Sequence, residues 1–235
     1  MAASLWGCFF IFVFYHIMKF IKTITLLSLV VLLCSGIGAN PVGHFRTPGF
    51  MPAGKDSLWA EINFDSLNII NKMAYADTAN FMHEKIYPCA RCFLRPEVAQ
   101  ALEMANEIAQ DKGFKLVIYD CYRPYGYQRK MYDLVNNPVY VAKPGKGSNH
   151  NRGAAVDLSL TDTNGQLLDM GNAFDDFSER SNYANDSISR QAKKNRKLLR
   201  TIMVRAGFTP YESEWWHFDY RQKRYATAGF KWECP

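Results

Sequence analysis

Residues 148–160 read Ser-Asn-His-Asn-Arg-Gly-Ala-Ala-Val-Asp-Leu-Ser-Leu. The first six belong to a glycine-rich loop, and the apolar run that follows predicts a β-strand. His150 lies in the loop and Asp157 in the strand, seven positions apart. Because side chains alternate between the faces of a strand, this odd separation would send the two side chains to opposite faces of one regular strand. A turn around Gly153 would bring them together.

Helical and extended patterns alternate irregularly on both sides of this stretch. Pro96 suits the first turn of a helix with an apolar stripe, and Gly113 suits its end. Without strict strand–helix–strand alternation, the pattern predicts an α+β fold: a single domain with an antiparallel sheet flanked by helices. The other predicted elements are strands over 114–119, 154–160, 208–211 and 215–220, the last two as a hairpin, and helices over 125–135 and 189–206.

Composition and charge limit the class of protein. The 235 residues suffice for one large domain or two small ones, and 48% hydrophobic with 21% charged residues exclude a disordered chain. The formal net charge is +6, but two of the positive charges lie in the N-terminal 38 residues. The densest basic cluster, 190–200, is predicted to be the solvated face of a helix. We therefore expect no nucleic-acid partner.

The N-terminal 38 residues have the pattern of a secretory signal. Their only charged side chains are Lys19 and Lys22, which precede an apolar run over 24–33 and small residues over 36–39. The apolar run is short for a membrane span. The sequence therefore predicts a leader over 1–38 and export to the periplasm or cell envelope.

Two features of this leader leave alternatives open. The uncharged apolar residues 1–17 are not needed by a signal peptide, so we expect translation to start at Met18. A helical hairpin anchor is the competing interpretation, in which an uncleaved leader is the only contact with the membrane. A lipid anchor on Cys34 is disfavoured by the large Leu33 before it. After the leader we expect a linker over 39–59 and a folded domain over 60–235.

Four cysteines follow the leader: Cys89, Cys92, Cys121 and Cys234. An even number in an oxidising compartment favours disulfides, and four cysteines allow three pairings. The Cys89-Ala-Arg-Cys92 motif is also half of a zinc site, but no second such motif completes it. Structural cysteines are the preferred interpretation.

Two histidines occur with carboxylates at short spacings. His150 precedes Asp157, and Glu214 lies three residues before His217. Two His and one Asp, with a free carboxylate beside them, have the composition of a catalytic zinc site with an open fourth position. Such a site lowers the pKa of water, and the carboxylate accepts the proton. On these residues alone, hydrogen-bonded core or surface roles stand equally beside the metal site, and His83 and the linker residue His44 are expected to have only such roles.

Six stretches together identify a family resemblance. Ser148-Asn-His-x-x-Gly-Ala-Ala-x-Asp157 and Glu214-x-Trp-His217 resemble the two metal motifs of the zinc D-alanyl-D-alanine dipeptidases, the VanX-like branch of the M15 peptidases. The resemblance covers roughly residues 60–220, nearly all of the chain after the leader. Four further stretches match in the same order: 75–81, 120–124, 170–176 and 179–181.

The resemblance implies a role for each matched position. It implies one zinc ion per chain, bound in the central cleft by His150, Asp157 and His217. Glu214 would be the general base and then the acid that protonates the leaving amine. Arg123 would hold the substrate carbonyl and its developing oxyanion, with a structural arginine as the alternative.

The resemblance also implies how a dipeptide is bound. Asp175 matches the acidic residue that pairs with the ammonium group, while Ser148 and Tyr75 match positions near the substrate. Asn149 stands where some family members have a second serine, which leaves the recognition of the carboxylate group open. The substrate implied is D-Ala-D-Ala, and the domain over 60–235 would be the catalytic domain.

The function implied is hydrolysis of D-Ala-D-Ala to two D-alanines in peptidoglycan turnover or salvage. One alternative is a D,D- or L,D-carboxypeptidase on the same fold, which trims peptidoglycan stems. Asp175 distinguishes the two, because an acylated nitrogen would leave its carboxylate unpaired. A second alternative is a wall-binding module with a structural zinc, which would not need Glu214 beside His217. The oligomeric state cannot be derived from the sequence.

Overall fold

The structure, a computed structural model, describes residues 58–235 and the strand Phe50–Pro52. The predicted leader and most of the predicted linker lie outside the described residues, as does His44. The described residues belong to one compact unit. Within the described part of the chain, no helix is both long and apolar enough to cross a bilayer.

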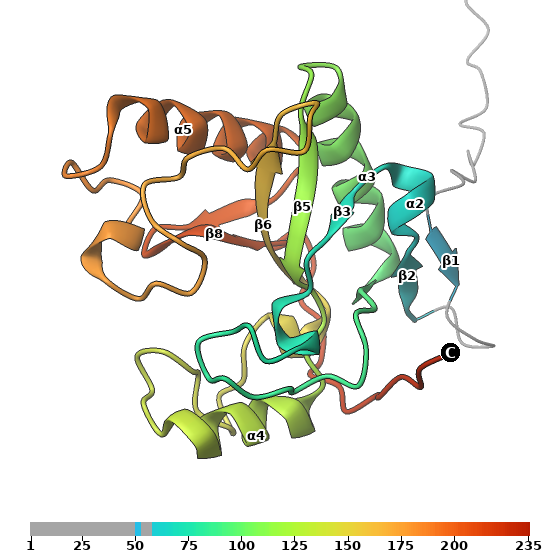
Figure 1. Cartoon of the computed structure of the whole chain (residues 1–235). Helices are drawn as coiled ribbons and strands as arrows, with labels where there is room; N and C mark the ends of the chain where they lie inside the picture. Colours follow the sequence, from blue (N-terminus) through green and yellow to red (C-terminus); the bar gives the residue numbers. More distant parts are fainter. Residues whose placement is uncertain (1–49, 53–57) are drawn as a thin grey trace, which may run out of the picture. The chain divides into compact units, whose positions relative to one another are not determined.

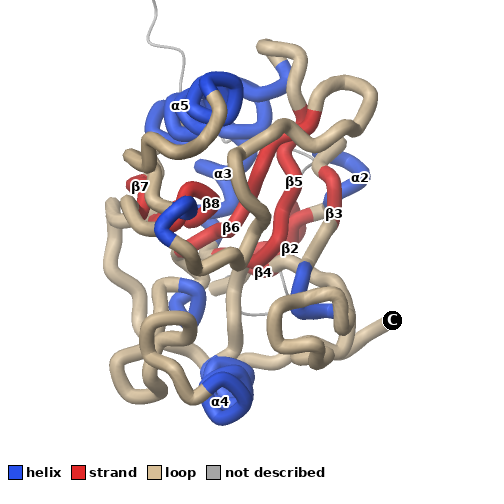
Figure 2. Tube along the Cα trace, turned by 60° about the vertical axis from the view of Figure 1, so that its left-hand side comes forward, coloured by secondary structure: helices blue, strands red, loops and turns tan. Residues whose placement is uncertain are grey.

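A five-stranded sheet forms the centre of the fold, in the order β3-β5-β6-β8-β7 (Figures 1 and 2). Four strands pair antiparallel, as predicted, and the last two form the predicted hairpin. The edge strand β3 instead runs parallel to β5, and two residues are too short a pattern to predict. All residues of the central strand β6 are buried. The strands are β3 (Ile70–Asn71), β5 (Lys115–Asp120), β6 (Ala155–Thr161), β7 (Thr209–Tyr211) and β8 (Glu214–Asp219).

A second, three-stranded sheet has the order β1-β2-β4. Its strands are β1 (Phe50–Pro52), β2 (Ala60–Ile62) and β4 (Phe93–Leu94). Strand β1 lies within the stretch predicted as a linker and pairs antiparallel with β2. Regular structure therefore begins before residue 60.

Helices lie at both ends of the main sheet. In Figures 1 and 2, α5 lies at one end and α4 at the other. Helix α3 packs against β5, β2 and α5, so the predicted sheet flanked by helices is confirmed. The helices are α2 (Phe64–Leu67), α3 (Pro96–Gln110), α4 (Tyr125–Val135) and α5 (Arg190–Arg205), with single turns of 3-10 helix at Ala74–Ala76, His150–Arg152 and Glu179–Ser181.

Helix α5 shows why its boundaries could be predicted. The hydroxyl of Ser189 accepts a hydrogen bond from the backbone N–H of Ala192, which caps the first turn. Gly207, with φ of +93°, follows the last turn in a conformation that favours glycine. Leu199 and Ile202, three positions apart on the same face of the helix, are fully buried.

One prediction about this helix holds only in part. The solvated face predicted over 190–200 is confirmed for Arg190, Lys194 and Lys197, which are exposed, but Arg196 is only 1% exposed. Its guanidinium donates hydrogen bonds to four oxygen atoms of the segment 170–182. These bonds replace water, and therefore a residue type that is usually exposed lies in the core.

Two disulfides resolve the open pairing: Cys89–Cys234 and Cys92–Cys121. Both cysteines of the Cys89-Ala-Arg-Cys92 motif are therefore structural, and neither is a zinc ligand. The first disulfide ties the C-terminal tail to the domain, where Trp232 is buried. Disulfides are typical of proteins outside the reducing cytosol.

Candidate metal centre and active site

The register of the main sheet brings two predicted ligands together. Asp157 on β6 is paired directly with His217 on β8 and, on its other side, with Asp120 on β5. Directly opposite residues of antiparallel strands share a face of the sheet. Two residues 60 positions apart in the sequence therefore meet at the same place.

His150 reaches this place from the turn before β6. It begins the 3-10 turn His150–Arg152, and Gly153 ends that turn with φ of +65°. A Cβ atom at Gly153 would overlap the ring of Trp59, so only glycine fits. The predicted convergence of His150 and Asp157 around this turn is confirmed.

The three side chains present ligand atoms to a common point. Nε2 of His150 lies 3.1 Å from Nδ1 of His217 and 3.2 Å from Oδ2 of Asp157. Nδ1 of His217 lies 2.9 Å from Oδ1 of Asp157. Around a tetrahedral zinc at its usual bond lengths, ligand atoms would be about 3.3 Å apart. The spacing therefore fits a zinc ion, and the three residues form a candidate metal site.

Hydrogen bonds to the outer nitrogens support this fit. Nδ1 of His150 lies 2.6 Å from the carbonyl oxygen of Cys121, and Nε2 of His217 lies 2.9 Å from Oδ1 of Asp219. Because these oxygens accept hydrogen bonds, we place the ring protons on the outer nitrogens. Both inner nitrogens then direct lone pairs at each other and at Asp157. Such an arrangement requires a cation, or a proton, between them.

The pKa of His217 reflects the same need for a cation or a proton between the inner nitrogens. Burial alone would lower the pKa of His217, but hydrogen bonds to Asp157 and Asp219 raise that pKa well above its usual value. Asp157 responds in the opposite direction: burial would raise its pKa, but His150 and His217 lower it. A proton or a metal ion at this point would therefore be stabilised by the same three side chains.

Glu214 lies beside this group and outside it. Its Oε2 is 4.0 Å from Nδ1 of His217, farther than the contacts within the triad. Burial is the main cause of a raised pKa of Glu214, and the negative Asp157 adds to the effect. A carboxylate close to the ligands, with an increased affinity for protons, is suited to proton transfer.

Arg123 is buried and fixed by its neighbours. Its Nε and Nη2 donate to Oδ2 of Asp120 at 3.1 and 2.6 Å, and Nη1 donates to Oε1 of Gln128 at 3.1 Å. The guanidinium also lies 5.2 Å from the centre of the Tyr75 ring. Burial opposes the charge, but Asp120 contributes to a pKa of Arg123 above the usual value. The arginine is thus structurally paired and part of the pocket wall.

Asp175 has an unusual backbone and a buried carboxyl group. Its φ is +59°, in the left-handed region that residues other than glycine seldom occupy. The hydroxyl of Tyr75 donates a 2.9 Å hydrogen bond to Oδ2 of Asp175. Burial, followed by the negative Asp157, raises the pKa of Asp175 well above its usual value. A cation at this position would stabilise the ionised carboxylate.

One pocket of about 770 Å³ contains all eight predicted site residues. Ser148 is among them, and its Oγ accepts a 3.2 Å hydrogen bond from the backbone N–H of His150. The exposed His83 does not line the pocket. The eight residues are Tyr75, Arg123, Ser148, His150, Asp157, Asp175, Glu214 and His217. Their roles stay predictions.

A family comparison agrees with this geometry. The model of Peptidase_M15, described as D-ala-D-ala dipeptidase, matches residues 65–234. The chain belongs to this family.

Curated relatives of this M15 peptidase share most of its length. The D-alanyl-D-alanine dipeptidase of Escherichia coli K12 is 44% identical over 159 residues, which are 68% of this chain and 81% of that protein. The D-alanyl-D-alanine dipeptidase of Enterococcus faecium is 33% identical over 178 residues, 66% of this chain and 88% of that protein. A solved zinc complex of a vancomycin-resistance D,D-pentapeptidase mutant is 18% identical, covers 55% of this chain and 73% of that one, and has a TM-score of 0.36.

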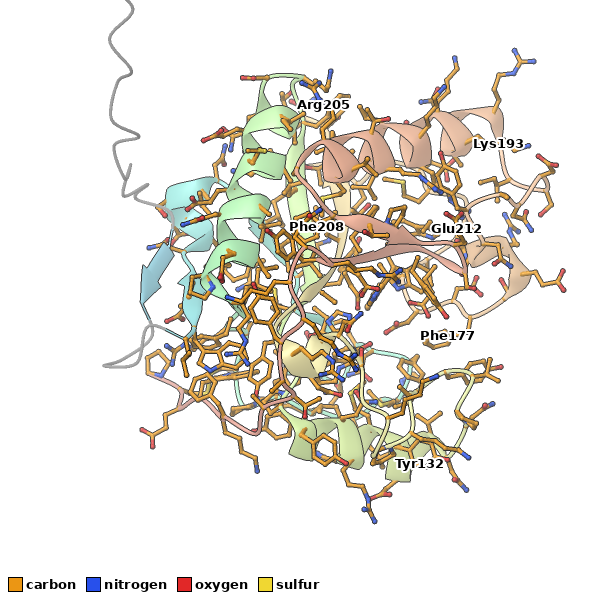
Figure 3. All side chains as sticks on the ribbon, turned by 180° about the vertical axis from the view of Figure 1, so that it is seen from behind. Tyr132, Phe177, Lys193, Arg205, Phe208 and Glu212 are labelled. Atoms are coloured by element: carbon orange, nitrogen blue, oxygen red, sulfur yellow. A yellow bond between two sulfur atoms is a disulfide. The ribbon has the colours of Figure 1, made fainter. Side chains whose placement is uncertain are left out.

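Sequence reasoning missed several residues that shape the site of this M15 peptidase. Asp219 lies two positions after His217 on β8, a spacing that puts both on one face and could have revealed the pair. No spacing pattern links Phe177 with Tyr140, although their rings stack with centres 4.8 Å apart and both line the pocket. In Figure 3, Phe177 lies between the β7–β8 hairpin, marked by Glu212, and the α4 segment.

Proposed function

We propose that this protein hydrolyses D-Ala-D-Ala to two D-alanines with one zinc ion per chain. The observation that carries the proposal is one pocket in which three converging metal-ligand side chains lie beside Glu214 and face Asp175. The relatives in Escherichia coli and Enterococcus faecium are named for this activity.

Glu214 is the proposed proton carrier. A zinc ion held by His150, Asp157 and His217 would supply Lewis acidity for the attack of water on the peptide carbonyl. Glu214 accepts the proton of the attacking water and then delivers it to the amide nitrogen that leaves. Its position 4.0 Å from His217, outside the ligand triad, supports this division of roles.

Arg123 is proposed to stabilise the negative charge that develops on the carbonyl oxygen. Its ion pair with Asp120 fixes the guanidinium before the substrate arrives, and fixed donors lose little energy to reorganisation. A buried arginine that lines the pocket supports this role.

Asp175 is proposed to bind the free ammonium group of the dipeptide. The ammonium would provide the cation that this buried carboxyl group needs, and the hydrogen bond from Tyr75 orients the carboxylate. Ser148, which lies two residues before His150 and lines the same pocket, is proposed to contact the substrate.

Substrate length distinguishes this function from a carboxypeptidase. A pocket of about 770 Å³ is large for a dipeptide, so volume alone would admit longer chains. Discrimination must therefore come from Asp175, whose carboxylate would stay unpaired beside an acylated nitrogen. We expect the purified protein to release D-alanine from D-Ala-D-Ala and hardly any from N-acetyl-D-Ala-D-Ala. Equal or faster release from the acetylated peptide would establish a carboxypeptidase instead.

We further propose that residues 1–38 direct export to the periplasm or cell envelope, and that 60–235 is the catalytic domain. Two disulfides support an oxidising compartment. Mass spectrometry of the exported protein should show an N-terminus between about residues 35 and 41. A mature chain that retains Trp6 would support the membrane-anchor alternative.

An exported enzyme would meet D-Ala-D-Ala released from peptidoglycan, rather than the precursor inside the cell. We therefore propose a role in turnover or salvage. A deletion strain should grow more slowly than its parent when D-Ala-D-Ala is the nutrient supplied. Equal growth would count against salvage.

A further inference from the structure

The segment 170–182 carries two residues of the pocket wall, Asp175 and Phe177. Only Glu179–Ser181 in this segment has regular structure. Asp175 also has the left-handed backbone conformation, which costs free energy at a residue with a side chain. Hydrogen bonds within the segment, together with contacts from outside it, therefore keep Asp175 where it is.

Arg196 of helix α5 supplies such contacts. Its side chain is among the largest fully buried ones of the described residues. All four of its hydrogen bonds end on the segment 170–182. Nε donates to the carbonyl oxygen of Met170 at 2.6 Å, Nη1 to that of Asn182 at 2.8 Å, and Nη2 to that of Arg180 at 2.8 Å and to Oδ1 of Asn172 at 2.9 Å.

These bonds join the two ends of the segment. Met170 and Asn182 stand at its first and last positions, and both bind the same guanidinium. The planar group has donors in fixed directions, so it sets the relative positions of its acceptors in a way that a lysine ammonium cannot. The relative positions of the two ends of the loop, which has Asp175 near its middle, are thereby fixed.

The chemistry of the acceptors indicates a geometric role. None of the four is a carboxylate, and burial lowers the pKa of Arg196 to about 10. The negative charge of Asp169 partly offsets the cost of burying this cation, but all four hydrogen bonds of the guanidinium go to neutral oxygens, so these bonds do not neutralise the charge. They define the shape of the loop instead.

Asn172 connects the loop with the strand of the metal site. Its Oδ1 accepts the bond from Arg196 and a second bond, at 2.8 Å, from Nε1 of Trp215. Trp215 lies on β8 between Glu214 and His217. The loop is thus placed relative to the strand that carries these two residues.

We propose that Arg196 is a positioning residue that places the Asp175 carboxylate for the ammonium group of the substrate, and so sets the preference for unacylated dipeptides. The inference rests on the proposed function. Arg196 itself does not line the pocket and acts through the loop.

The test compares Arg196→Lys with Arg200→Lys. Arg200 lies on the same helix but pairs with Glu212 at the surface, so it controls for loss of an arginine on α5. For Arg196→Lys we expect KM for D-Ala-D-Ala to rise on the order of tenfold or more, since small misplacements of a binding group have effects of this size. The preference for D-Ala-D-Ala over N-acetyl-D-Ala-D-Ala should fall, while zinc content stays at one per chain.

A second variant tests the inference even if Arg196→Lys does not fold. Asn172→Ala removes one acceptor of Arg196, the connection to Trp215 and two hydrogen bonds that Asn172 donates to Asp176 and Ser181, but it leaves the buried guanidinium and its three backbone acceptors in place. It should raise KM in the same direction. Binding of a phosphinate analogue of D-Ala-D-Ala, measured by calorimetry, should weaken in both variants.

The outcomes separate the two proposals. If the wild type hydrolyses D-Ala-D-Ala and both variants keep its KM and selectivity, with only a lower melting temperature, Arg196 is merely structural and the inference is overturned. If Arg196→Lys does not fold, an unchanged KM in Asn172→Ala overturns it. A wild type that binds zinc but does not hydrolyse the dipeptide would refute the proposed function itself.

Discussion

The carbonyl oxygen of Cys121 lies 2.6 Å from Nδ1 of His150, and Cys121 is disulfide-bonded to Cys92. A covalent link thus fixes the peptide group that orients a proposed zinc ligand. Partners of the outer nitrogen set the tautomer and direction of a ligating histidine. One disulfide therefore supports the metal site directly, whereas the other ties down the C-terminal tail.

Removing the disulfide next to His150 should weaken zinc binding. In Cys92→Ser/Cys121→Ser the carbonyl group remains, but its position is less constrained. We expect zinc affinity to fall about tenfold, at the lower end of effects seen for such partners. Competition with a chromogenic chelator measures this.

The matched control is Cys89→Ser/Cys234→Ser, which also removes one disulfide. It opens a loop with a sequence separation of 145 residues and should cost about 2–5 kcal/mol of stability. Its zinc affinity should stay near that of the wild type. Equal losses of affinity in both double variants would show that the Cys121–His150 contact has no special effect.

Loss of one histidine ligand should abolish stoichiometric zinc. In His150→Ala or His217→Ala only two of three protein ligands remain, and a catalytic site has none to spare. Elemental analysis after dialysis should show well under one zinc per chain. The exposed His83→Ala is the control and should keep full zinc. Full zinc in both ligand variants would refute the ligand assignment.

Glu214→Ala should separate catalysis from metal binding. Because Glu214 lies outside the triad, the variant should keep its zinc and its circular dichroism spectrum. Its kcat should fall about 10²–10⁴-fold, the usual contribution of an acid–base group. The control is Glu212→Ala, two residues away and paired with Arg200 at the surface. A Glu214→Ala variant with near wild-type kcat would require another proton carrier.

Zinc affinity should depend on pH through His217. In the metal-free protein the pKa of His217 is raised above 6.5, so a proton competes with zinc up to higher pH than for an ordinary histidine. Affinity should therefore keep rising above pH 6.5. By linkage, the stabilising effect of this proton on the metal-free protein is lost as pH rises through the folded-state pKa.

Asp219→Asn tests the cause of this dependence. It removes a charged partner of Nε2 of His217 and should lower the pKa of that histidine, so that the rise in zinc affinity ends at lower pH. The measurement is a series of chelator competitions between about pH 6 and 9, around the ordinary histidine pKa. An affinity that is constant above pH 6.5 in the wild type would contradict the prediction.

Local signals in the sequence predicted much of the fold. Helix α4 has the predicted bounds, and the left-handed turn at Gly153 brings His150 and Asp157 together as expected. These features depend on turn residues and apolar spacing over short stretches. The parallel pairing of β3 depends on partner residues 47 positions away and leaves no local pattern.

All eight predicted site residues line one pocket. They could be predicted because they belong to sequence motifs that can be recognised together. What supports them could not be predicted in the same way. Arg196 looks like a surface residue in a basic helix, and its burial depends on carbonyl groups that no side-chain pattern records. Similarly, four cysteines allow three pairings, and only the folded structure shows that Cys121 pairs with Cys92.

We propose that this chain cleaves D-Ala-D-Ala by means of one zinc ion at His150, Asp157 and His217. The most direct measurement is the release of D-alanine from D-Ala-D-Ala by chelator-treated protein during titration with zinc. We expect negligible activity without metal and a linear rise to a plateau at one zinc per chain. Full activity of the metal-free protein, or no activity at full zinc occupancy, would contradict it.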